Sequence, residues 1–366
     1  MTRAMDDEID ICDPLRASLT KDDSVRFCTM EKVKSRYIRS ERDLLVAEGL
    51  NELVKRAISR AGAGLPAERA FRPEGRALVV VGQSGAGKTT TLSRAFHNHP
   101  AFSNFGNPDC PLISVRVPKP SSLKDVGILL LVELGFPMSA DRKLRIVWAK
   151  VRERLELLNV RIIHMDEIQN ITSTANVIEV DLINDTIKSL LNDTRYPVCL
   201  VLSGLPEIAP FLSKDRQIGR RCQFIAFQQI GPNDFDSMSR ALIGLAKTAD
   251  LEVSPNTTHD LIPRLAHAAL YQMGIAIEIM QDAIDQTLKT KKSILTIEEF
   301  ATAYAQRNFC MAAENPFLAR NWAEIDCAKK LGGREVDLGI VQIIAGGAPE
   351  EPAKPVRRYK TVKRKG

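Results

Sequence analysis

The segment Ala77-Leu-Val-Val-Val-Gly-Gln-Ser-Gly-Ala-Gly-Lys-Thr89 decides the fold of this 366-residue chain. Its first five residues are apolar and mostly β-branched, which is typical of a strand buried on both faces of a parallel sheet. The next eight follow the spacing G-x-x-x-x-G-K-[ST]. Glycines at this spacing let backbone N–H groups turn inward around phosphates. We therefore predict a phosphate-binding loop between a buried strand and a helix.

Each part of the loop has an expected role in binding ATP and Mg²⁺. Lys88 should reach the β- and γ-phosphate oxygens, and Thr89 should offer its hydroxyl to Mg²⁺. A helix over residues 88–97 would direct its positive N-terminal end at the phosphates. The residues expected to bind the nucleotide are Gly82, Gln83, Ser84, Gly85, Ala86, Gly87, Lys88, Thr89 and Thr90.

Short apolar strands alternate with helical stretches after the loop. The pattern predicts further strands at 112–117, 160–165, 198–202 and 223–227, and helices at 122–134, 142–158 and 180–192. This alternation is typical of an α/β fold, so we expect a parallel five-stranded sheet sandwiched by helices. An amphipathic helix that begins near Ser40 should lead into the sheet.

The pattern changes after Pro232 to helices alone, which predicts a small all-helical lid domain. These helices are expected at 235–249, 257–269, 275–289 and 297–307. The chain should therefore divide into an N-terminal arm (1–39), a nucleotide-binding α/β domain with its leading helix (40–231), the helical lid (232–310) and a C-terminal extension (311–366) that ends in a flexible basic tail.

Composition and charge restrict the class of protein. The chain is 44% hydrophobic and 26% charged, and its net charge is +6. Residues 349–366 hold seven basic and two acidic side chains, so most of the excess charge lies in this tail. The tail could bind phosphates, dock on a partner or act as a solubilising terminus.

We find no apolar run of the roughly 20 residues that a membrane helix needs, and no secretory signal. The seven cysteines form no C-x-x-C pair. A cytoplasmic protein with reduced thiols is expected.

Acidic and hydroxyl residues follow two of the predicted strands. Asp166 and Glu167 end the strand at 160–165; an aspartate there can hold Mg²⁺, and the adjacent glutamate can orient and polarise an attacking water. Within that strand, His164 is expected to be a buried, hydrogen-bonded core residue rather than a catalyst. Ser203 follows the fourth strand, where its hydroxyl could touch the γ-phosphate or the attacking water, or simply complete a Ser-Gly turn.

Three arginines lie just before the fifth predicted strand, in Asp215-Arg-Gln-Ile-Gly-Arg-Arg221. Arg216, Arg220 and Arg221 could be solvated surface residues. One of them could instead reach a phosphate bound to a neighbouring subunit, where a guanidinium neutralises charge in the transition state.

In this order, these motifs resemble the AAA+ ATPases, and within them the TniB/TnsC/MuB group of transposition regulators, TniB most closely. The segments that carry the similarity to TniB, besides the arginine segment above, are Glu41-Arg-Asp-Leu-Leu45, Val117-Pro-Lys-Pro-Ser-Ser-Leu-Lys124, Ile163-His-Met-Asp-Glu-Ile168 and Leu202-Ser-Gly-Leu-Pro206. The resemblance extends from about residue 35 to residue 307.

The resemblance implies an ATPase that assembles as a ring or filament on double-stranded DNA when ATP is bound. Such proteins recruit or activate a DDE transposase (TniA/TnsB-like), with a TniQ-like targeting protein as a further partner, and hydrolysis remodels the assembly. It implies that Asp166 helps to hold the metal, that Glu167 acts on water and that Ser203 takes the first sensor position. Arg221 or Arg220 would be the finger that acts in trans. Lys119 and Lys124 become candidates for DNA contacts, with plain solvation as the alternative.

One position departs from the family pattern. Many AAA+ proteins place an arginine on a lid helix, where this chain has Ile277. Hydrolysis should then be slow, which suits an assembly switch better than a motor.

The alternative functions are a replication initiator or helicase loader of the AAA+ class, a small-molecule phosphotransferase, and a signalling switch. The segment after Arg307 is short for the winged-helix domain that initiators carry, and the lid lacks a phosphotransferase's arginine cluster. Glu167 argues against a switch that does not hydrolyse its nucleotide.

Overall fold

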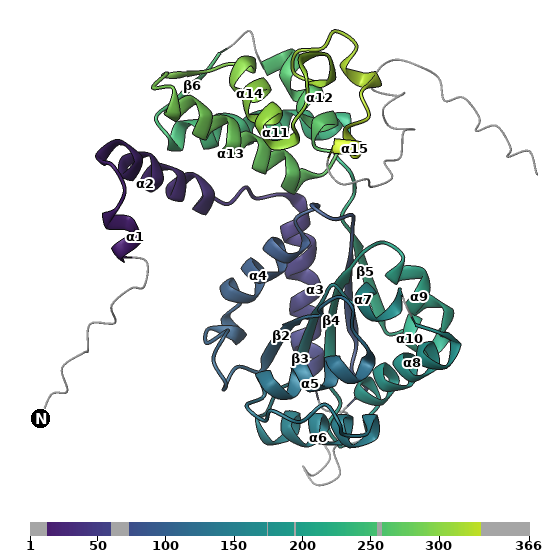
Figure 1. Cartoon of the computed structure of the whole chain (residues 1–366). Coiled ribbons are helices and arrows are strands. Elements are labelled where there is room, and N and C mark those ends of the chain that lie inside the picture. Colours follow the sequence, from purple (N-terminus) through teal and green to yellow (C-terminus); the bar gives the residue numbers. More distant parts are fainter. Residues whose placement is uncertain (1–12, 60–72, 174, 194, 255–257, 331–366) are drawn as a thin grey trace, which may run out of the picture. The chain divides into compact units, whose positions relative to one another are not determined.

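The computed structural model describes residues 13–59, 73–173, 175–193, 195–254 and 258–330 (Figure 1). The chain divides into two compact units. The sheet unit comprises Ser35–Gln229 and Gln272–Ile277. The helical unit comprises Met1–Lys34, Ile230–Tyr271 and Glu278–Gly366. The predicted C-terminal tail and the first residues of the predicted arm lie outside the described residues.

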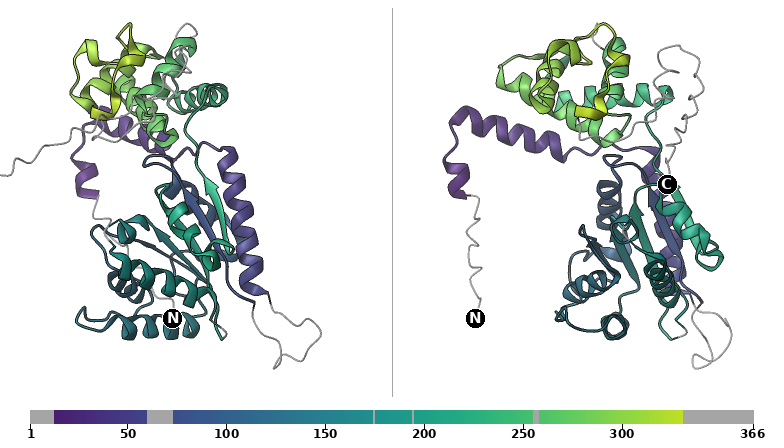
Figure 2. Two further views of the ribbon diagram at one scale, coloured as in Figure 1. Left: turned by 90° about the vertical axis from the view of Figure 1, so that its right-hand side faces the viewer. Right: turned by 45° about the vertical axis from the view of Figure 1, so that its right-hand side comes forward.

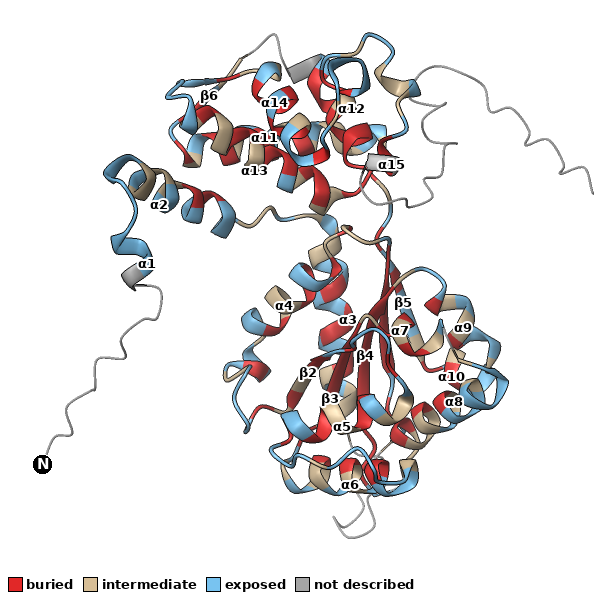
Figure 3. Ribbon diagram, in the orientation of Figure 1, coloured by how far each residue is buried: buried red, intermediate tan, exposed pale blue. Residues whose placement is uncertain are grey.

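The sheet unit is built on five parallel strands in the order β2-β3-β4-β1-β5. Their bounds are β1 (Ala77–Val81), β2 (Leu112–Arg116), β3 (Ile162–Asp166), β4 (Cys199–Gly204) and β5 (Cys222–Ala226). Each bound falls within two residues of the prediction, and the predicted fold class is confirmed. All residues of β1, β3 and β4 are buried, as their continuous apolar runs indicate (Figure 3).

The parallel register brings the carboxyl ends of the strands to one edge of the sheet. Val81 pairs with Gly204 across β1 and β4, and Arg116 pairs with Asp166 across β2 and β3. The loops that follow β1, β3 and β4 therefore open at the same edge, where ligands of such sheets bind.

Helices cover both faces of the sheet (Figure 2). Alternate residues of a strand point to opposite faces, so Leu78 and Val80 of β1 pack with one layer while Val79 and Val81 pack with the other. The first layer is formed by α3 and α4, and the second mainly by α5, α6 and α8. The helices of this unit are α3 (Glu41–Ile58), α4 (Lys88–Asn98), η1 (Pro100–Phe102), α5 (Leu123–Glu133), α6 (Leu144–Leu157), α7 (Gln169–Thr172), α8 (Val177–Leu191), α9 (Ile208–Lys214) and α10 (Arg216–Gly219).

Polar caps fix where α3 and α5 begin. The carboxylate of Asp43 accepts the backbone N–H of Ser40 at 2.7 Å, in front of α3. Asp125 accepts the backbone N–H of Ser122 at 2.8 Å in front of α5. Because a capping box satisfies N–H groups that have no partner within the helix, these starts could be predicted from sequence. The short helices α7, α9 and α10 were not predicted, since fewer than two turns leave no readable period.

The helical unit contains a small sheet that the sequence did not predict. The helices of the helical unit are α1 (Asp13–Ala17), α2 (Lys21–Ser35), η2 (Pro232–Asp234), α11 (Phe235–Thr248), α12 (Thr258–Ala268), α13 (Met273–Lys289), α14 (Ile297–Asn308), η3 (Ala312–Glu314), η4 (Trp322–Glu324) and α15 (Cys327–Lys330). Between them, β6 (Glu252–Val253) pairs in parallel with β7 (Ile294–Leu295). The prediction of an all-helical lid was therefore wrong in this detail, because two-residue strands show no alternation. No helix in the described ranges is long and apolar enough to cross a membrane.

Residues after α14 continue the helical unit. Asn315 donates through Nδ2 to the carbonyl oxygen of Ala301 at 2.8 Å, and it is almost fully buried. Arg264 on α12 donates to the carbonyl oxygens of Pro316 and Ala319 at 2.8 and 2.7 Å. The start of the C-terminal extension is thus packed on α12 and α14, at least as far as Ala319.

The contact between α5 and α6 allows a test of packing. A Cβ on Gly127 would lie 2.7 Å from Cγ1 of Val147 and 3.2 Å from Nε1 of Trp148. An alanine in an exposed helix stabilises by about 1 kcal/mol relative to glycine, whereas overpacking costs about 1–3 kcal/mol. Gly127→Ala should therefore lower the free energy of unfolding, measured by chemical denaturation.

The double variant Gly127→Ala/Val147→Ala is the matched control for this prediction. Removing the Val147 methyl groups opens space for the new Cβ, so the two losses should be less than additive. Additive losses, or stabilisation by Gly127→Ala alone, would show that α5 and α6 do not approach as closely as described.

Candidate nucleotide-binding site

The glycine loop joins β1 to α4 and wraps around its own lysine. Gly85 and Gly87 have φ angles of +80° and +92°, which L-residues with side chains rarely adopt. Lys88 is buried, and its Nζ donates to the carbonyl oxygens of Gly82 at 2.8 Å and Gln83 at 3.1 Å. Gly87 caps α4, so the loop lies at the positive end of that helix. The backbone conformation is that of a phosphate-binding loop.

Asp166 connects this loop to the ends of β3 and β4. Its Oδ2 accepts from the hydroxyl of Thr89 at 2.8 Å. Its Oδ1 accepts from the hydroxyl of Ser203 at 2.6 Å and from the backbone N–H of Glu167 at 3.0 Å. Asp166 is 2% exposed and Ser203 is fully buried. The sheet therefore brings together three residues that the sequence places 77 and 37 positions apart.

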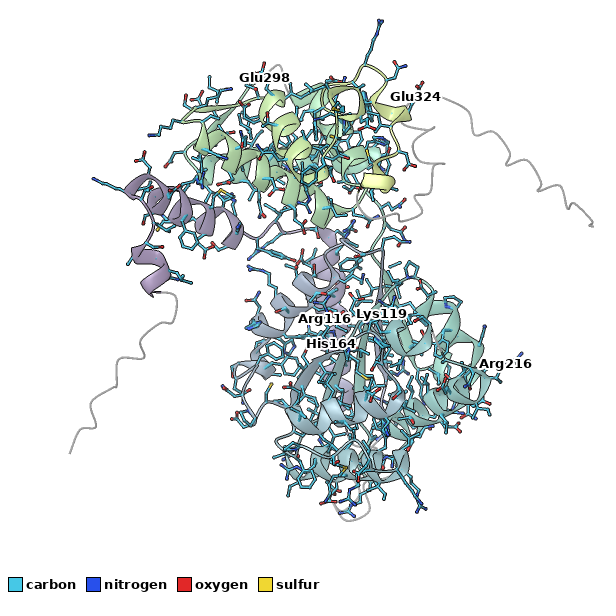
Figure 4. The ribbon with its side chains drawn as sticks, viewed as in Figure 1. Arg116, Lys119, His164, Arg216, Glu298 and Glu324 are labelled. Atoms are coloured by element: carbon cyan, nitrogen blue, oxygen red, sulfur yellow. The ribbon has the colours of Figure 1, made fainter. Side chains whose placement is uncertain are left out.

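His164 extends the hydrogen bonds of Asp166 across the sheet. Its Nε2 lies 2.9 Å from Oγ of Ser203, and its Nδ1 lies 2.8 Å from Oγ of Ser114 on β2. Burial lowers the pKa of His164 to about 4, against the opposing charge of Asp166. The ring packs edge-on against Phe96, with the centroids 5.1 Å apart. His164 is thus a buried and hydrogen-bonded residue, as expected, and it lies inside the sheet unit (Figure 4).

Glu167 is held by a residue that sequence reasoning missed. Its φ angle is +58°, which is unusual for a residue with a side chain. Gln169 donates through Nε2 to the carboxylate of Glu167, and its Oε1 accepts the backbone N–H of Leu205 at 3.2 Å. Gln169 is buried. The available signal was the polar pair Gln169-Asn170 between Ile168 and Ile171, directly after Glu167.

The residues present fit a magnesium nucleotide. A hydroxyl and a carboxylate, both oxygen donors of the kind Mg²⁺ prefers, meet at Thr89 and Asp166 beside the loop. Lys88 and the backbone N–H groups at the start of α4 supply positive charge for phosphates.

Two side chains near the start of α3 support the glycine loop and α4. Arg42 donates to the carbonyl oxygen of Ala86 at 3.2 Å and to that of Gln228 at 2.6 Å. The hydroxyl of Tyr37 lies 3.2 Å from Oγ1 of Thr91, and it also donates to Asp43. Burial raises the pKa of Tyr37 to about 12, and the bond to Asp43 adds to this effect. The sequence indicated the leading helix but not these contacts.

The first turn of α13 belongs to the sheet unit and packs on the loop. A Cβ on Gly274 would lie 2.5 Å from the carbonyl oxygen of Gly85, so only glycine allows this approach. A Cβ on Gly85 would in turn lie 2.5 Å from Cγ1 of Ile275. Ile277, which stands where many AAA+ proteins have arginine, follows in the next turn and is half-buried.

The structure separates the three arginines that the sequence grouped. Arg221 is 6% exposed; its Nε and Nη2 bind the carboxylate of Glu74 at 3.1 and 2.6 Å, and Nη1 donates to the carbonyl oxygen of Gln217. This hydrogen-bonded ion pair lowers the pKa of Glu74. Arg216 and Arg220 are exposed, and Arg216 lies at the outer edge of the sheet unit (Figure 4). The expectation that Arg221 acts as a finger is at odds with this geometry, because its guanidinium is already bound within its own chain.

The two lysines proposed for DNA contacts also differ. Lys119 is exposed in the loop after β2, near the exposed Arg116 (Figure 4). Lys124 is half-buried, and its Nζ donates to the carbonyl oxygen of Ala140 at 2.9 Å. Lys119 and Arg116 therefore present charge to solvent, whereas Lys124 fastens the start of α5 to the segment before α6.

The fold and the site define the class of the protein: the sheet unit is a P-loop domain of the AAA+ type. Residues 53–231 match the family model described as "Bacterial TniB protein". This matched range, just under half of the chain, is similar to the TniB family and contains the glycine loop, Asp166 and Glu167. No curated protein matches the sequence at a significant level.

Solved structures show the same fold. Cdc6p from Pyrobaculum aerophilum aligns with a TM-score of 0.55 at 15% identity, over 88% of this chain and 86% of that chain. The Orc1 protein of Aeropyrum pernix, solved in complex with DNA, aligns with a TM-score of 0.54 at 16% identity, over 76% of this chain and 69% of that chain. At this level of identity the similarity establishes the architecture alone.

The division among the arginines gives a test. Arg221→Ala should lower the free energy of unfolding by about 1–3 kcal/mol, because it removes a buried partner of Glu74 and of the Gln217 carbonyl. Arg220→Ala, at an exposed site, should leave stability within about 0.5 kcal/mol of the unchanged protein. If Arg220 is the finger, its loss should lower ATP hydrolysis by the assembled protein on the order of 10³-fold.

Chemical denaturation and steady-state hydrolysis, measured on the same preparations, distinguish the two residues. Arg216→Ala serves as the matched exposed control. Loss of hydrolysis with unchanged stability in Arg221→Ala would restore Arg221 as the finger and would show that its bond to Glu74 opens in the assembly.

Proposed function

We propose that the protein is an ATP-dependent regulator of DNA transposition that assembles on double-stranded DNA and is released by slow ATP hydrolysis. The observation that carries this proposal is the cluster of Thr89, Asp166 and Glu167 beside the glycine loop, in a domain that matches the TniB family.

The chain's own residues divide the work at the nucleotide. Lys88 and the N-terminal N–H groups of α4 bind the phosphates, and Thr89 with Asp166 would hold Mg²⁺, which supplies charge neutralisation at the phosphates when it is bound. Glu167 accepts the proton of the attacking water. The hydrogen bond from Gln169 fixes the orientation of the Glu167 carboxylate.

We infer assembly from the positions of the arginines within one chain. Among the described residues of the sheet unit, Arg221 is bound to Glu74, whereas Arg216 and Arg220 are exposed before β5, whose first residue pairs with the first residue of β1 and not with its loop end. An exposed arginine of a neighbouring copy would complete the site. Nucleotide occupancy would then control whether copies join as a ring or filament.

Binding of double-stranded DNA is supported by charge and by the family. Arg116 at the end of β2 and Lys119 after it are exposed, and residues 53–231 match the TniB family model, a resemblance that implies a role in transposition. Phosphate contacts of this kind give affinity without sequence preference and weaken with salt. A DDE transposase and a TniQ-like targeting protein are the proposed partners.

A replication initiator or helicase loader of the AAA+ class is the second candidate, and the architecture shared with Cdc6p and Orc1 is compatible with it. In the described part of the chain after α14, only the short elements η3, η4 and α15 follow. The two candidates differ in what the assembled protein stimulates, which is strand transfer by a transposase in one case and loading of a helicase in the other.

Imaging by electron microscopy tests the lead proposal. The protein, double-stranded DNA and a slowly hydrolysed ATP analogue should together give rings or filaments that neither ligand gives alone. Glu167→Gln should give the same assemblies with ATP itself, because binding is retained while hydrolysis is lost. Lys88→Ala should give none with any nucleotide.

The control separates DNA binding from assembly. Lys119→Ala and Arg116→Ala should reduce assembly on DNA without changing nucleotide affinity, and the reduction should be greatest at low salt and should shrink as salt screens the phosphate contacts. A monomer that ignores DNA in the presence of the analogue would contradict the proposal.

A further inference from the structure

The buried chain from Ser114 through His164 to Ser203 and Asp166 has a definite direction of hydrogen bonding. Asp166 accepts through both carboxylate oxygens, so Ser203 must donate its only hydroxyl proton to Oδ1 at 2.6 Å. The contact of 2.9 Å between Oγ of Ser203 and Nε2 of His164 then requires a proton on Nε2. With that proton in place, Nδ1 of the neutral ring is an acceptor, and Ser114 donates to it at 2.8 Å.

The sheet leaves the ring little choice of orientation. Ser114 and His164 are register partners on β2 and β3, and His164 and Asp166 share a face of β3 because they are two residues apart. Phe96 packs edge-on against the ring with the centroids 5.1 Å apart. Rotating the ring by half a turn would place carbon atoms opposite both serine hydroxyls, which are buried or nearly so.

We propose that His164 is a positioning residue for the metal-side carboxylate. By donating from Nε2, it directs the proton of Ser203 at Asp166 and keeps that carboxylate fixed between Ser203 and Thr89. This rests on the proposed function in one respect, namely that Asp166 faces the metal. Ser203 accordingly acts on Asp166 rather than as a donor to the γ-phosphate, since it has a single proton and the carboxylate holds it.

The tautomer can be measured without nucleotide, metal or activity. The full-length protein, labelled with ¹⁵N at histidine, should show at neutral pH one ring in the neutral Nε2–H form, with a protonated Nε2 and an unprotonated Nδ1. His164→Gln identifies the resonances by their loss. An Nδ1–H ring, or a doubly protonated ring, at position 164 would overturn the proposal.

A pair of variants tests the positioning itself. The amide nitrogen of a glutamine side chain can occupy the place of Nε2, whereas that of an asparagine can only approach the place of Nδ1. His164→Gln should therefore keep most of the gain in nucleotide affinity that Mg²⁺ confers. His164→Asn should lose roughly 10-fold of it, as expected when a second partner of a metal-side ligand is removed.

The readout is the ratio of nucleotide dissociation constants in Mg²⁺ and in EDTA, with thermal unfolding recorded for both variants. A merely structural histidine would lower stability in both variants and would leave the ratio unchanged, which would overturn the proposal. Ser203→Ala in the His164→Asn background should add little, because without the donor at position 164 the proton of Ser203 is no longer directed at Asp166; additive losses would contradict the proposal. If the unchanged protein binds no nucleotide, the proposed function fails, while the ¹⁵N measurement still decides the tautomer.

Discussion

The carboxylate of Asp166 is the group on which the site depends. Hydroxyls from the helix after β1 and from the end of β4 converge on it, and so does the backbone N–H of Glu167. No local segment could hold it this way. The convergence results from parallel strands in the order β2-β3-β4-β1-β5, which places β4 between the strand that carries Asp166 and the strand that carries the loop. A buried carboxylate is tolerated here because its oxygens are hydrogen-bonded.

Much of this arrangement could be predicted because it is encoded in runs of adjacent residues. The strand at Ala77–Val81 and the glycine loop are contiguous, and β3 before Asp166 is apolar apart from His164. The small sheet of β6 and β7, and the short helices α7, α9 and α10, could not be predicted, since their stability comes from distant neighbours and not from periodicity.

The residues of the site also divide into those that the sequence could predict and those that it could not. Residue types at fixed spacing identified Lys88, Thr89, Asp166 and Glu167. Partners joined only in space were missed: Gln169 beside Glu167, and Arg42 on the carbonyl oxygen of Ala86. For the arginines, sequence could group Arg220 with Arg221 but could not show that Glu74, 147 positions earlier, already binds one of them. Exposure and ion pairing are properties of the fold, so three neighbouring arginines acquire different roles.

On the proposed function, one chain would present half of an inter-subunit site. The loop, Asp166 and Glu167 lie together, and exposed Arg220 would act on a neighbouring copy. A site built in this way couples nucleotide binding to assembly, because the two halves meet only when copies join. Slow hydrolysis, expected from Ile277, would make the assembly long-lived.

The most direct test of the central claim is an experimental structure of the protein with Mg²⁺ and a non-hydrolysable ATP analogue. We expect the metal to be held by Thr89 and Asp166, beside phosphates bound at the glycine loop. We also expect Nζ of Lys88 to leave the carbonyl oxygens of Gly82 and Gln83 for the phosphates. A nucleotide bound away from the glycine loop, or a metal held without Thr89 and Asp166, would contradict the central claim.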